Sequence, residues 1–343
     1  MKKIIIGNRE ISENKKPLII PEIGINHEGN LKKAKRMIKD AHDVGAECVK
    51  FQCHVIEDEM IYNEVIPGNS DETIWNIMKR CALSEKDELE LKEYTEELGL
   101  IYISTPFSRE AADRLNRIGV DCFKIGSGEC NNYPLLKHIV KFGKPIILST
   151  GMNNILSISK SVNILKNGKI SFAILHATSI YPTPYEKVRL DAIYELKKEF
   201  PNIPIGLSDH SLGNYACFAA IAMGATILEK HFTSDKSWEG PDISLSITPN
   251  ELKDLIDGSN AIYESMGGTK DILDEESPTI NFAYSSVVSI KDINIGEKFS
   301  MENIWVKRPG TGKIRAEEFE KILNKKAKNK IPKNVQLTWN MIE

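Results

Sequence analysis

Two short segments decide the fold of this chain: Pro204-Ile205-Gly206-Leu207-Ser208-Asp209-His210 and Thr226-Ile227-Leu228-Glu229-Lys230-His231. Each is an apolar run that ends in polar or charged residues, and the helical pattern of Tyr215–Met223 separates them. A short apolar run followed by a helix is typical of one unit of a parallel sheet. Residues 18–231 contain eight such runs: Leu18–Ile23, Cys48–Phe51, Ile101–Ser104, Cys122–Ile125, Pro145–Ser149, Phe172–His176, Pro204–Ser208 and Thr226–His231.

Helical patterns separate most of these runs and follow the last one. They cover Leu31–Val44, Lys86–Leu98, Arg109–Ile118, Tyr133–Phe142, Ile155–Lys166, Leu190–Phe200, Tyr215–Met223 and Glu251–Met266. Eight strand–helix units predict a closed parallel (β/α)₈ barrel, which needs about 250 residues. Such barrels build their active sites at the C-terminal ends of the strands, so we expect the chemistry of this chain there.

The chain has 343 residues, which leaves room for one small further domain. The pattern changes around Gly267–Thr279, which we interpret as a linker, and short strands and turns follow from Ser285. The sequence therefore predicts a barrel with its linker over residues 1–277 and a small C-terminal domain over residues 285–343.

The composition narrows the class of protein. A hydrophobic fraction of 41% and a charged fraction of 27% are typical of a folded chain. A net charge of −3 gives no overall attraction to nucleic acid or to an anionic membrane. No apolar run is long enough for a transmembrane helix or a signal peptide, and the six scattered cysteines indicate free thiols. We expect a cytoplasmic protein with neither nucleic acid nor membrane as a partner.

Two histidines indicate a metal site. His210 and His231 end the seventh and eighth predicted strands, and neighbouring strands lie about 4.8 Å apart. Two imidazoles with open positions favour a catalytic divalent ion, and Mn²⁺, Fe²⁺, Co²⁺ or Zn²⁺ over Mg²⁺. The alternative is that each histidine only caps its strand by hydrogen bonding; two on adjacent strand ends favour the metal.

Cationic and hydroxyl side chains at the strand ends predict a phosphate site. They are Lys50, Thr105, Lys124, Ser127, Ser149 and Ser208. Two ammonium groups and several hydroxyls form an anion cradle without a glycine-rich nucleotide loop, which this chain lacks. The alternatives are surface ion pairs, or a lysine that forms a Schiff base as in class I aldolases.

Carboxylates at the same end are acid–base candidates: Glu22, Glu129, Asp209 and Asp242. Glu22 is the best of them, because it ends the first strand and an acid buried in a barrel mouth is costly unless it is used or paired. His27, His54 and the run Glu57–Glu59 are interpreted as loop residues on a solvated face.

At these residues the chain resembles the bacterial sialic acid synthase family over essentially its whole length. The matching blocks are Pro21–His27, Val49–Gln52, Val65–Asn69, Ser104–Ser108, Lys124–Pro134, Ser149–Met152, Tyr181–Pro184, Gly206–His210 and Gly240–Asp242. The tail, through Asp292-Ile293, Gly296-Glu297 and Arg308-Pro309-Gly310, resembles the antifreeze-protein-like domain of that family.

The resemblance implies a reaction in which phosphoenolpyruvate condenses with an N-acetylmannosamine-type aldose, water adds and phosphate leaves. It implies that His210 and His231 hold the metal, most often Mn²⁺ with Mg²⁺ or Co²⁺ as substitutes, and that Glu22 transfers a proton. It assigns the six residues of the anion cradle to phosphoenolpyruvate. The sugar contacts that it implies are Gln52, Asn69, Ser179, Tyr181 and Asp242, with Arg308 from the other subunit of a domain-swapped homodimer.

Three departures from the N-acetylneuraminate enzymes bear on the aldose. Phe51 stands where those often have His, Ala177-Thr178-Ser179 replaces a Cys-Thr-Asn run, and Trp238–Asp242 replaces Arg-Pro-Gly-Pro-Asp. These variants resemble enzymes that make legionaminic acid from 2,4-diacetamido-2,4,6-trideoxymannose; N-acetylmannosamine is the alternative. Two other classes are weighed against this reading, namely a class I Schiff-base aldolase and a carbohydrate-binding protein without catalysis.

Overall fold

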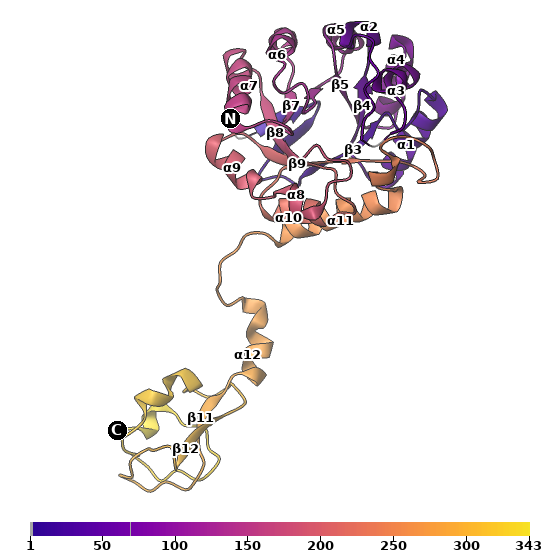
Figure 1. The fold of residues 1–343 in the computed structure, drawn as a ribbon. Coiled ribbons are helices and arrows are strands. Elements are labelled where there is room, and N and C mark those ends of the chain that lie inside the picture. Colours follow the sequence, from indigo (N-terminus) through magenta and orange to yellow (C-terminus); the bar gives the residue numbers. More distant parts are fainter. Residues whose placement is uncertain (1–2, 69) are drawn as a thin grey trace. The chain divides into compact units, whose positions relative to one another are not determined.

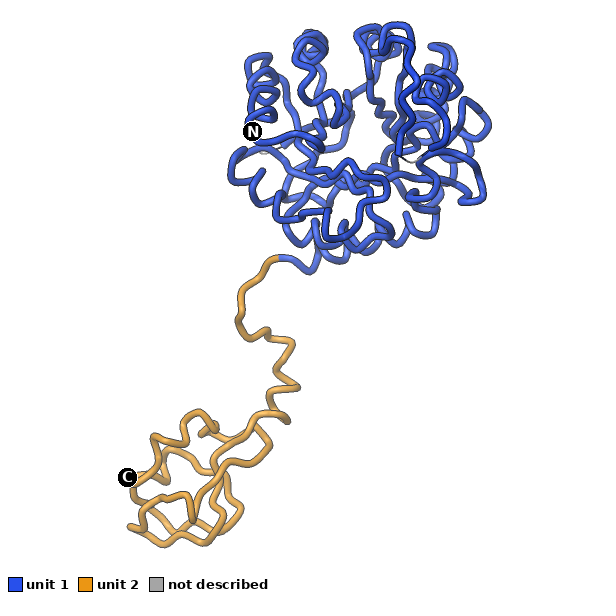
Figure 2. Tube along the Cα trace, viewed as in Figure 1, with its two compact units in different colours: residues 1–266 blue, residues 267–343 orange. Residues whose placement is uncertain are grey.

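The computed structural model describes residues 3–68 and 70–343. They divide into two compact units, one that ends at Met266 and one that covers Gly267–Glu343 (Figure 2). No helix in the described part of the chain is long and apolar enough to cross a bilayer.

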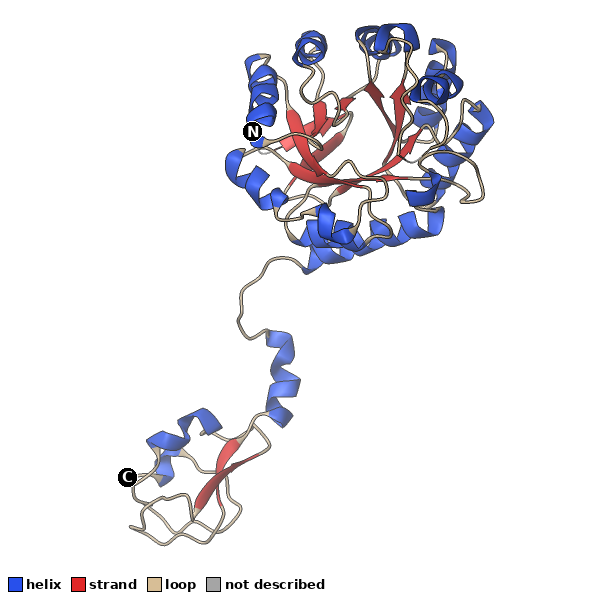
Figure 3. Ribbon diagram, in the orientation of Figure 1, coloured by secondary structure: helices blue, strands red, loops and turns tan. Residues whose placement is uncertain are grey.

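The first unit contains the predicted barrel. Its eight parallel strands close in the order β10-β3-β4-β5-β6-β7-β8-β9, and helices surround them (Figures 1 and 3). The strands are β3 (Leu18–Gly24), β4 (Cys48–Cys53), β5 (Ile101–Pro106), β6 (Phe123–Ile125), β7 (Ile146–Ser149), β8 (Phe172–Ala177), β9 (Ile205–Asp209) and β10 (Ile227–His231). The prediction of the barrel is confirmed, and each strand ends within two residues of its predicted limits.

The covering helices are those that the apolar spacing predicts, together with the short helix α8, which it does not predict. They are α1 (Leu31–Asp43), α4 (Glu85–Glu97), α5 (Arg109–Ile118), α6 (Tyr133–Ile139), α7 (Ile155–Asn167), α8 (Tyr185–Val188), α9 (Ala192–Glu199), α10 (Tyr215–Ala222) and α11 (Pro249–Ser265). In α1, for example, Ala34, Met37, Ile38 and Ala41 form one buried face. Residues three and four apart lie on the same side of a helix, which explains the spacing of the apolar residues in the sequence.

A hairpin that the sequence analysis did not predict precedes the barrel. Its strands are β1 (Lys3–Ile6) and β2 (Arg9–Ser12), joined by a left-handed Gly7. Ile4, Ile6 and Ile11 pack with residues from the N-terminal parts of the barrel strands. This end of the barrel is filled with apolar side chains, so the polar residues of the barrel lie at the opposite end.

The second unit has a hydrophobic core of its own. Ten buried residues form it: Val287, Ile293, Phe299, Ile304, Ile314, Ile322, Ala327, Ile331, Leu337 and Ile342. Strands β11 (Ser286–Ser289) and β12 (Ile304–Lys307) pair antiparallel. The linker predicted for residues 267–279 is partly helical, since α12 covers Ser277–Ala283. Pro278 explains this, because proline in the first turn of a helix has the required φ and loses no hydrogen bond.

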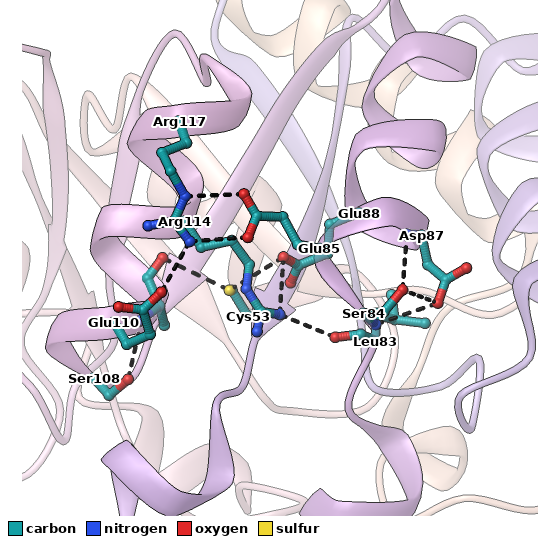
Figure 4. A network of polar contacts seen from close by, with 11 residues as sticks. Cys53, Leu83, Ser84, Glu85, Asp87, Glu88, Ser108, Glu110, Arg114 and Arg117 are labelled. Atoms are coloured by element: carbon teal, nitrogen blue, oxygen red, sulfur yellow. Dashed lines mark hydrogen bonds and ion pairs between the residues drawn. The ribbon is translucent and has the colours of Figure 1, made fainter.

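The longest connection of the barrel is the insertion between β4 and α4, which contains α2 (Ile56–Glu59) and α3 (Ile74–Cys81). Both of its ends are tied to one ion pair, the half-buried Arg114 of α5 with the buried Glu88 of α4, 3.4 Å apart (Figure 4). The Cys53 thiol donates to Glu88 Oε2 over 3.4 Å, and Arg114 donates to the carbonyl oxygen of Leu83 over 3.0 Å. The insertion is therefore anchored where it leaves the sheet and where it returns.

Candidate active site

The alternation of side chains along the strands sorts the polar residues of the barrel into two sets. Lys50 and Gln52 of β4 line the barrel mouth, while Phe51 packs on Tyr102 in the core behind the sheet. On β10, Glu229 and His231 line the mouth, and the intervening Lys230 pairs with Asp209 behind it. Every second residue of a strand faces the barrel interior, and this alternation brings lysines, carboxylates and histidines from different strands together in the mouth.

An inner cavity of about 280 Å³ occupies the mouth. Its lining includes twelve of the residues that the sequence singles out: Glu22, Lys50, Gln52, Thr105, Lys124, Ser127, Ser149, Ser179, Tyr181, Ser208, His210 and His231. The structure therefore brings the predicted anion cradle, the predicted acid and the histidine pair together.

Buried ion pairs organise the inner cavity. Lys50 Nζ lies 2.7 Å from Glu22 Oε2 and donates to Thr105 over 3.2 Å. Lys124 donates to Ser149 over 2.8 Å and lies 3.4 Å from Glu229 Oε1. Burial of these charges is costly, and the pairing of each lysine with a carboxylate offsets part of that cost. Both lysines also face the cavity, where an anion can bind.

Glu229 is a site residue that the sequence analysis missed. Ser208 donates to its Oε1 over 2.9 Å, and Lys50 lies 3.8 Å from its Oε2. Burial opposes its ionisation, but Lys124 and Lys50 outweigh burial and lower its pKa to about 2. One feature of the sequence could have revealed Glu229. It lies two residues before His231 in an apolar run, and residues two apart on a strand face the same side.

Glu22 has the opposite electrostatic character. Burial raises its pKa to about 7, although Lys50 acts against the shift, and the negative charge of Glu229 raises the pKa further. Gln52 donates from Nε2 to Glu22 Oε1 over 3.2 Å. A carboxyl group that titrates near neutrality can take up and release a proton under working conditions.

The rings of two histidines lie close together in the inner cavity. The ring centroids of His210 and His231 lie 5.6 Å apart. The Thr178 carbonyl oxygen lies 2.8 Å from His210 Nδ1 and can only accept, so Nδ1 carries the proton and Nε2 keeps its lone pair. Burial lowers the pKa of His210 to about 4 and that of His231 to about 3, so both rings are neutral at pH 7.

The donor set fits an open site and not a closed cage. Over the described residues, no group of three or more His, Cys, Asp or Glu side chains could hold a metal by itself. Asp242 Oδ2 lies 3.7 Å from His231 Nδ1, and burial raises the pKa of Asp242 to about 6. Two histidines would leave the remaining positions of an ion to substrate and water.

A second, outer cavity of about 470 Å³ shares a wall with the first. Gln52, Phe107, Tyr181 and His231 line both. Asp242 belongs to the outer lining, and the insertion supplies much of the rest, including His54, Glu59, Pro67, Gly68, Ile74, Ile77 and Met78. Sequence reasoning missed the apolar part of this wall, because Ile74, Ile77 and Met78 belong to a helix of eight residues inside the insertion.

Several interpretations of single residues need correction. His54 is 3% exposed and lines the outer cavity, and His27 is 1% exposed, so neither belongs to a solvated face. Phe51 lies behind the sheet and cannot contact an aldose in either cavity. Trp238 packs against Lys33 and Arg36 of α1, with their cations 4.9 and 5.3 Å from the centroids of its rings.

Two of the acid–base candidates are occupied elsewhere. Asp209 accepts from Lys230 over 2.6 Å and from Ser211, on the helix side of the sheet. Glu129 accepts from Asn132 over 2.6 Å in the loop after β6. Asn69 lies outside the described residues, and Arg308 belongs to the second unit, where its side chain is exposed.

Comparison with known proteins agrees with this geometry. Residues 37–271 match the NeuB family and residues 284–343 match the SAF domain. The chain is 41% identical over 321 residues to the N,N'-diacetyllegionaminic acid synthase of Campylobacter jejuni, with 91% of this chain and 96% of that protein covered. It is 35% identical over 295 residues to the N-acetylneuraminate-9-phosphate synthase of Homo sapiens, with 84% and 82% covered.

A solved structure extends the likeness to three dimensions. It is the N-acetylneuraminic acid synthetase of Leptospira borgpetersenii in complex with citrate, which is 34% identical to this chain. The TM-score is 0.75, and 81% of this chain and 95% of that chain are covered. The fold and the site define a barrel enzyme that forms carbon–carbon bonds. The chain belongs to the NeuB family and carries a SAF domain at residues 284–343, and it is a phosphoenolpyruvate-dependent transferase.

Proposed function

We propose that this enzyme condenses phosphoenolpyruvate with 2,4-diacetamido-2,4,6-trideoxymannose and water, and so makes N,N'-diacetyllegionaminate and phosphate. The observation that carries the proposal is the pair of adjoining cavities. The inner one is lined by two lysines and several hydroxyls, and the outer one is largely apolar. Gln52, Tyr181 and His231 lie where two substrates would meet.

The inner cavity supports phosphoenolpyruvate as its occupant. Lys50 and Lys124 supply two cations, and Thr105, Ser127, Ser149 and Ser208 supply hydroxyl donors around them. Charge-assisted hydrogen bonds of this kind are short and strong, and phosphate and carboxylate accept several at once. The ionised Glu229 between the lysines balances part of their charge in the absence of substrate.

The outer cavity supports an uncharged, partly apolar aldose. Its described lining includes Ile25, Ile74, Ile77 and Met78 and contains no lysine or arginine. A phosphorylated aldose would lack a cation in this wall, whereas a 6-deoxy carbon and acetamido methyl groups would bury apolar surface there.

N-acetylmannosamine is the second candidate for the aldose. Of the departures from the N-acetylneuraminate enzymes, Phe51 and Trp238 do not line either cavity, and Ser179 lines the inner one. Gln52, Tyr181 and Asp242 also offer polar groups to a more hydroxylated sugar.

The reaction follows from these groups. C3 of phosphoenolpyruvate bonds to the aldehyde carbon, whose oxygen takes a proton. A water oxygen bonds to C2 as Glu22 accepts a proton from it. The C2–O bond to phosphate then breaks, the hydroxyl on C2 loses its proton, and the ketone remains. Lys50 and Lys124 neutralise the departing phosphate.

We also propose a divalent ion on His210 and His231, Mn²⁺ first and Mg²⁺ or Co²⁺ as substitutes. Such an ion would polarise the aldehyde oxygen. As to assembly, we propose a homodimer in which Arg308 reaches the barrel of the partner subunit.

Phosphate release tests the proposed reaction. Wild-type enzyme with phosphoenolpyruvate and Mn²⁺ is assayed against 2,4-diacetamido-2,4,6-trideoxymannose, N-acetylmannosamine and N-acetylmannosamine 6-phosphate. We expect the highest kcat/KM with the first and the lowest with the third. A higher value with N-acetylmannosamine would select the second candidate. Inactivation by borohydride with substrate would indicate a Schiff base, and sugar binding without phosphate release a non-catalytic protein.

A further inference from the structure

A chain of hydrogen bonds runs from the insertion to the catalytic carboxyl group. Glu59 Oε2 lies 2.8 Å from His54 Nδ1, and His54 Nε2 lies 3.1 Å from Gln52 Oε1. Gln52 Nε2 then donates to Glu22 Oε1 over 3.2 Å. The His54 ring stacks on Phe107, with the centroids 4.6 Å apart.

The direction of each bond matters because the Gln52 amide has two unlike sides of almost the same shape. Its carbonyl oxygen only accepts, so His54 Nε2 donates to it while His54 Nδ1 donates to the Glu59 carboxylate, an arrangement that requires a proton on each ring nitrogen. The NH₂ group of the amide then faces Glu22. In the opposite orientation two oxygens, Gln52 Oε1 and Glu22 Oε1, would face each other in a buried place. Two buried oxygens that face each other form no hydrogen bond, and the free-energy cost of removing them from water remains.

Glu22 is thereby held at both oxygens. Lys50 lies 2.7 Å from Oε2, and Gln52 donates to Oε1. We propose that His54, held in place by Glu59, is a positioning residue for the condensation: it orients the Gln52 amide so that its N–H faces Glu22 and fixes the direction of that carboxyl. The competing explanation is that His54 only fills the wall of the outer cavity by packing on Phe107.

Two substitutions at His54 separate these explanations. His54→Phe keeps a ring that can stack on Phe107 and removes both hydrogen bonds. His54→Gln loses the ring and keeps an N–H donor near the place of Nε2. We expect His54→Phe to lower kcat about tenfold with little change in the KM for phosphoenolpyruvate, and His54→Gln to stay within about threefold of wild type. An equal or larger loss in His54→Gln would overturn the proposal.

A double-mutant cycle asks whether His54 acts through Gln52. In a Gln52→Ala background, His54→Phe should have almost no further effect on kcat, because the amide that it orients is absent. Losses that add would overturn the proposal. These kinetic tests use the aldose that gives turnover with the wild-type enzyme. The inference rests on the proposed function only for the choice of that substrate.

A spectroscopic readout needs no substrate. The chain contains two glutamines, Gln52 and Gln336, so ¹⁵N-labelled glutamine gives two side-chain NH₂ pairs in the wild type and a third, new pair in His54→Gln. We expect His54→Phe and Glu59→Ala to move the Gln52 pair, His54→Gln to return it toward wild type, and Gln336 to stay unchanged as an internal control. An unmoved Gln52 pair in His54→Phe would refute the proposal. Failure of the proposed aldose would appear separately, as absence of turnover in wild type.

Discussion

Lys124 illustrates how single residues set the properties of the site. It donates to Ser149 over 2.8 Å, lies 3.4 Å from Glu229 and faces the inner cavity. Burial lowers its pKa, and the charge of Glu229 acts against this shift. An incoming phosphate would therefore meet a cation whose present partners are a hydroxyl, one carboxylate and the carbonyl oxygen of Ile125.

Replacing Lys124 by alanine should weaken phosphoenolpyruvate far more than the aldose. A charge-assisted contact contributes about 1.5–3 kcal/mol, which corresponds to a loss of about tenfold to a hundredfold in apparent affinity. Initial rates at varied concentrations of each substrate measure this, with the surface variant Lys253→Ala as the control. An equal effect on both substrates would place Lys124 outside the anion site.

Glu22 should give the enzyme its pH dependence on the acid side. Its pKa is about 7 because of burial, and the proposed role of Glu22 in water attack requires the carboxylate form. We expect kcat/KM for phosphoenolpyruvate to rise with pH through a midpoint near 7, since this parameter reports the free enzyme. Glu22→Gln should remove this limb and lower the rate about 100-fold or more. A limb that persists in Glu22→Gln belongs to another group.

The histidine pair predicts a dependence on metal. EDTA should abolish activity and Mn²⁺ should restore it. Mutation of a residue that only hydrogen-bonds to a metal ligand already lowers metal affinity by about 10–100-fold. Loss of a ligand itself in His231→Ala should therefore weaken Mn²⁺ binding by more than about tenfold. Mn²⁺ titration followed by electron paramagnetic resonance measures binding apart from catalysis. Full activity in rigorously metal-free enzyme would contradict the proposed site.

At the scale of elements, the insertion between β4 and α4 supplies half of the residues that line the outer cavity, and the pair Arg114–Glu88 ties its two ends. A second set of contacts joins the same two helices, since Arg117 of α5 bridges Glu85 of α4 and Glu110 of α5 (Figure 4). Burial raises the pKa of Glu88, while its bonds with Cys53 and Arg114 act against that shift.

Removal of Arg114 should therefore affect stability and the aldose together. Arg114→Ala leaves Glu88 buried without its cation and frees the Leu83 carbonyl, at a cost of about 3 kcal/mol. We expect the KM of the aldose to rise more than that of phosphoenolpyruvate, because the insertion lines the outer cavity. In Arg114→Met with Glu88→Leu, stability should return while the KM of the aldose stays raised. Urea denaturation and initial rates measure the two effects, and recovery of both would argue against an anchoring role.

The elements also show what a sequence can predict. The eight barrel strands are apolar on both faces except at their C-terminal ends, so the runs and the polar residues that follow them were visible. Glu229 was hidden because its partners, Lys50 and Lys124, lie more than 100 residues away along the chain. The hairpin of β1 and β2 escaped notice because strands of four residues carry little periodic signal.

At the scale of the whole molecule, each unit has a separate core, and Arg308 follows β12 with an exposed side chain in the second unit. The described lining of the outer cavity contains no arginine or lysine of its own barrel. In the proposed homodimer, Arg308 would place one cation near the acetamido group of the sugar. In a closed dimer of identical subunits, the same arm can serve either its own barrel or that of the partner.

Mixed dimers distinguish these two arrangements. Arg308→Ala and His210→Ala subunits with different affinity tags are coexpressed, and the mixed dimers are isolated by two successive affinity steps. If the arm crosses, the barrel with an intact His210 receives an intact Arg308, while the other site loses both residues. The mixed dimer should then regain about half of the wild-type activity, because one of its two sites is whole. If each arm serves its own barrel, both sites lack one group and the mixed dimer should stay as inactive as the homodimers of either variant. A preparation that yields no mixed dimer although each subunit folds would contradict the dimer itself, and size-exclusion chromatography with light scattering on wild-type protein checks that result.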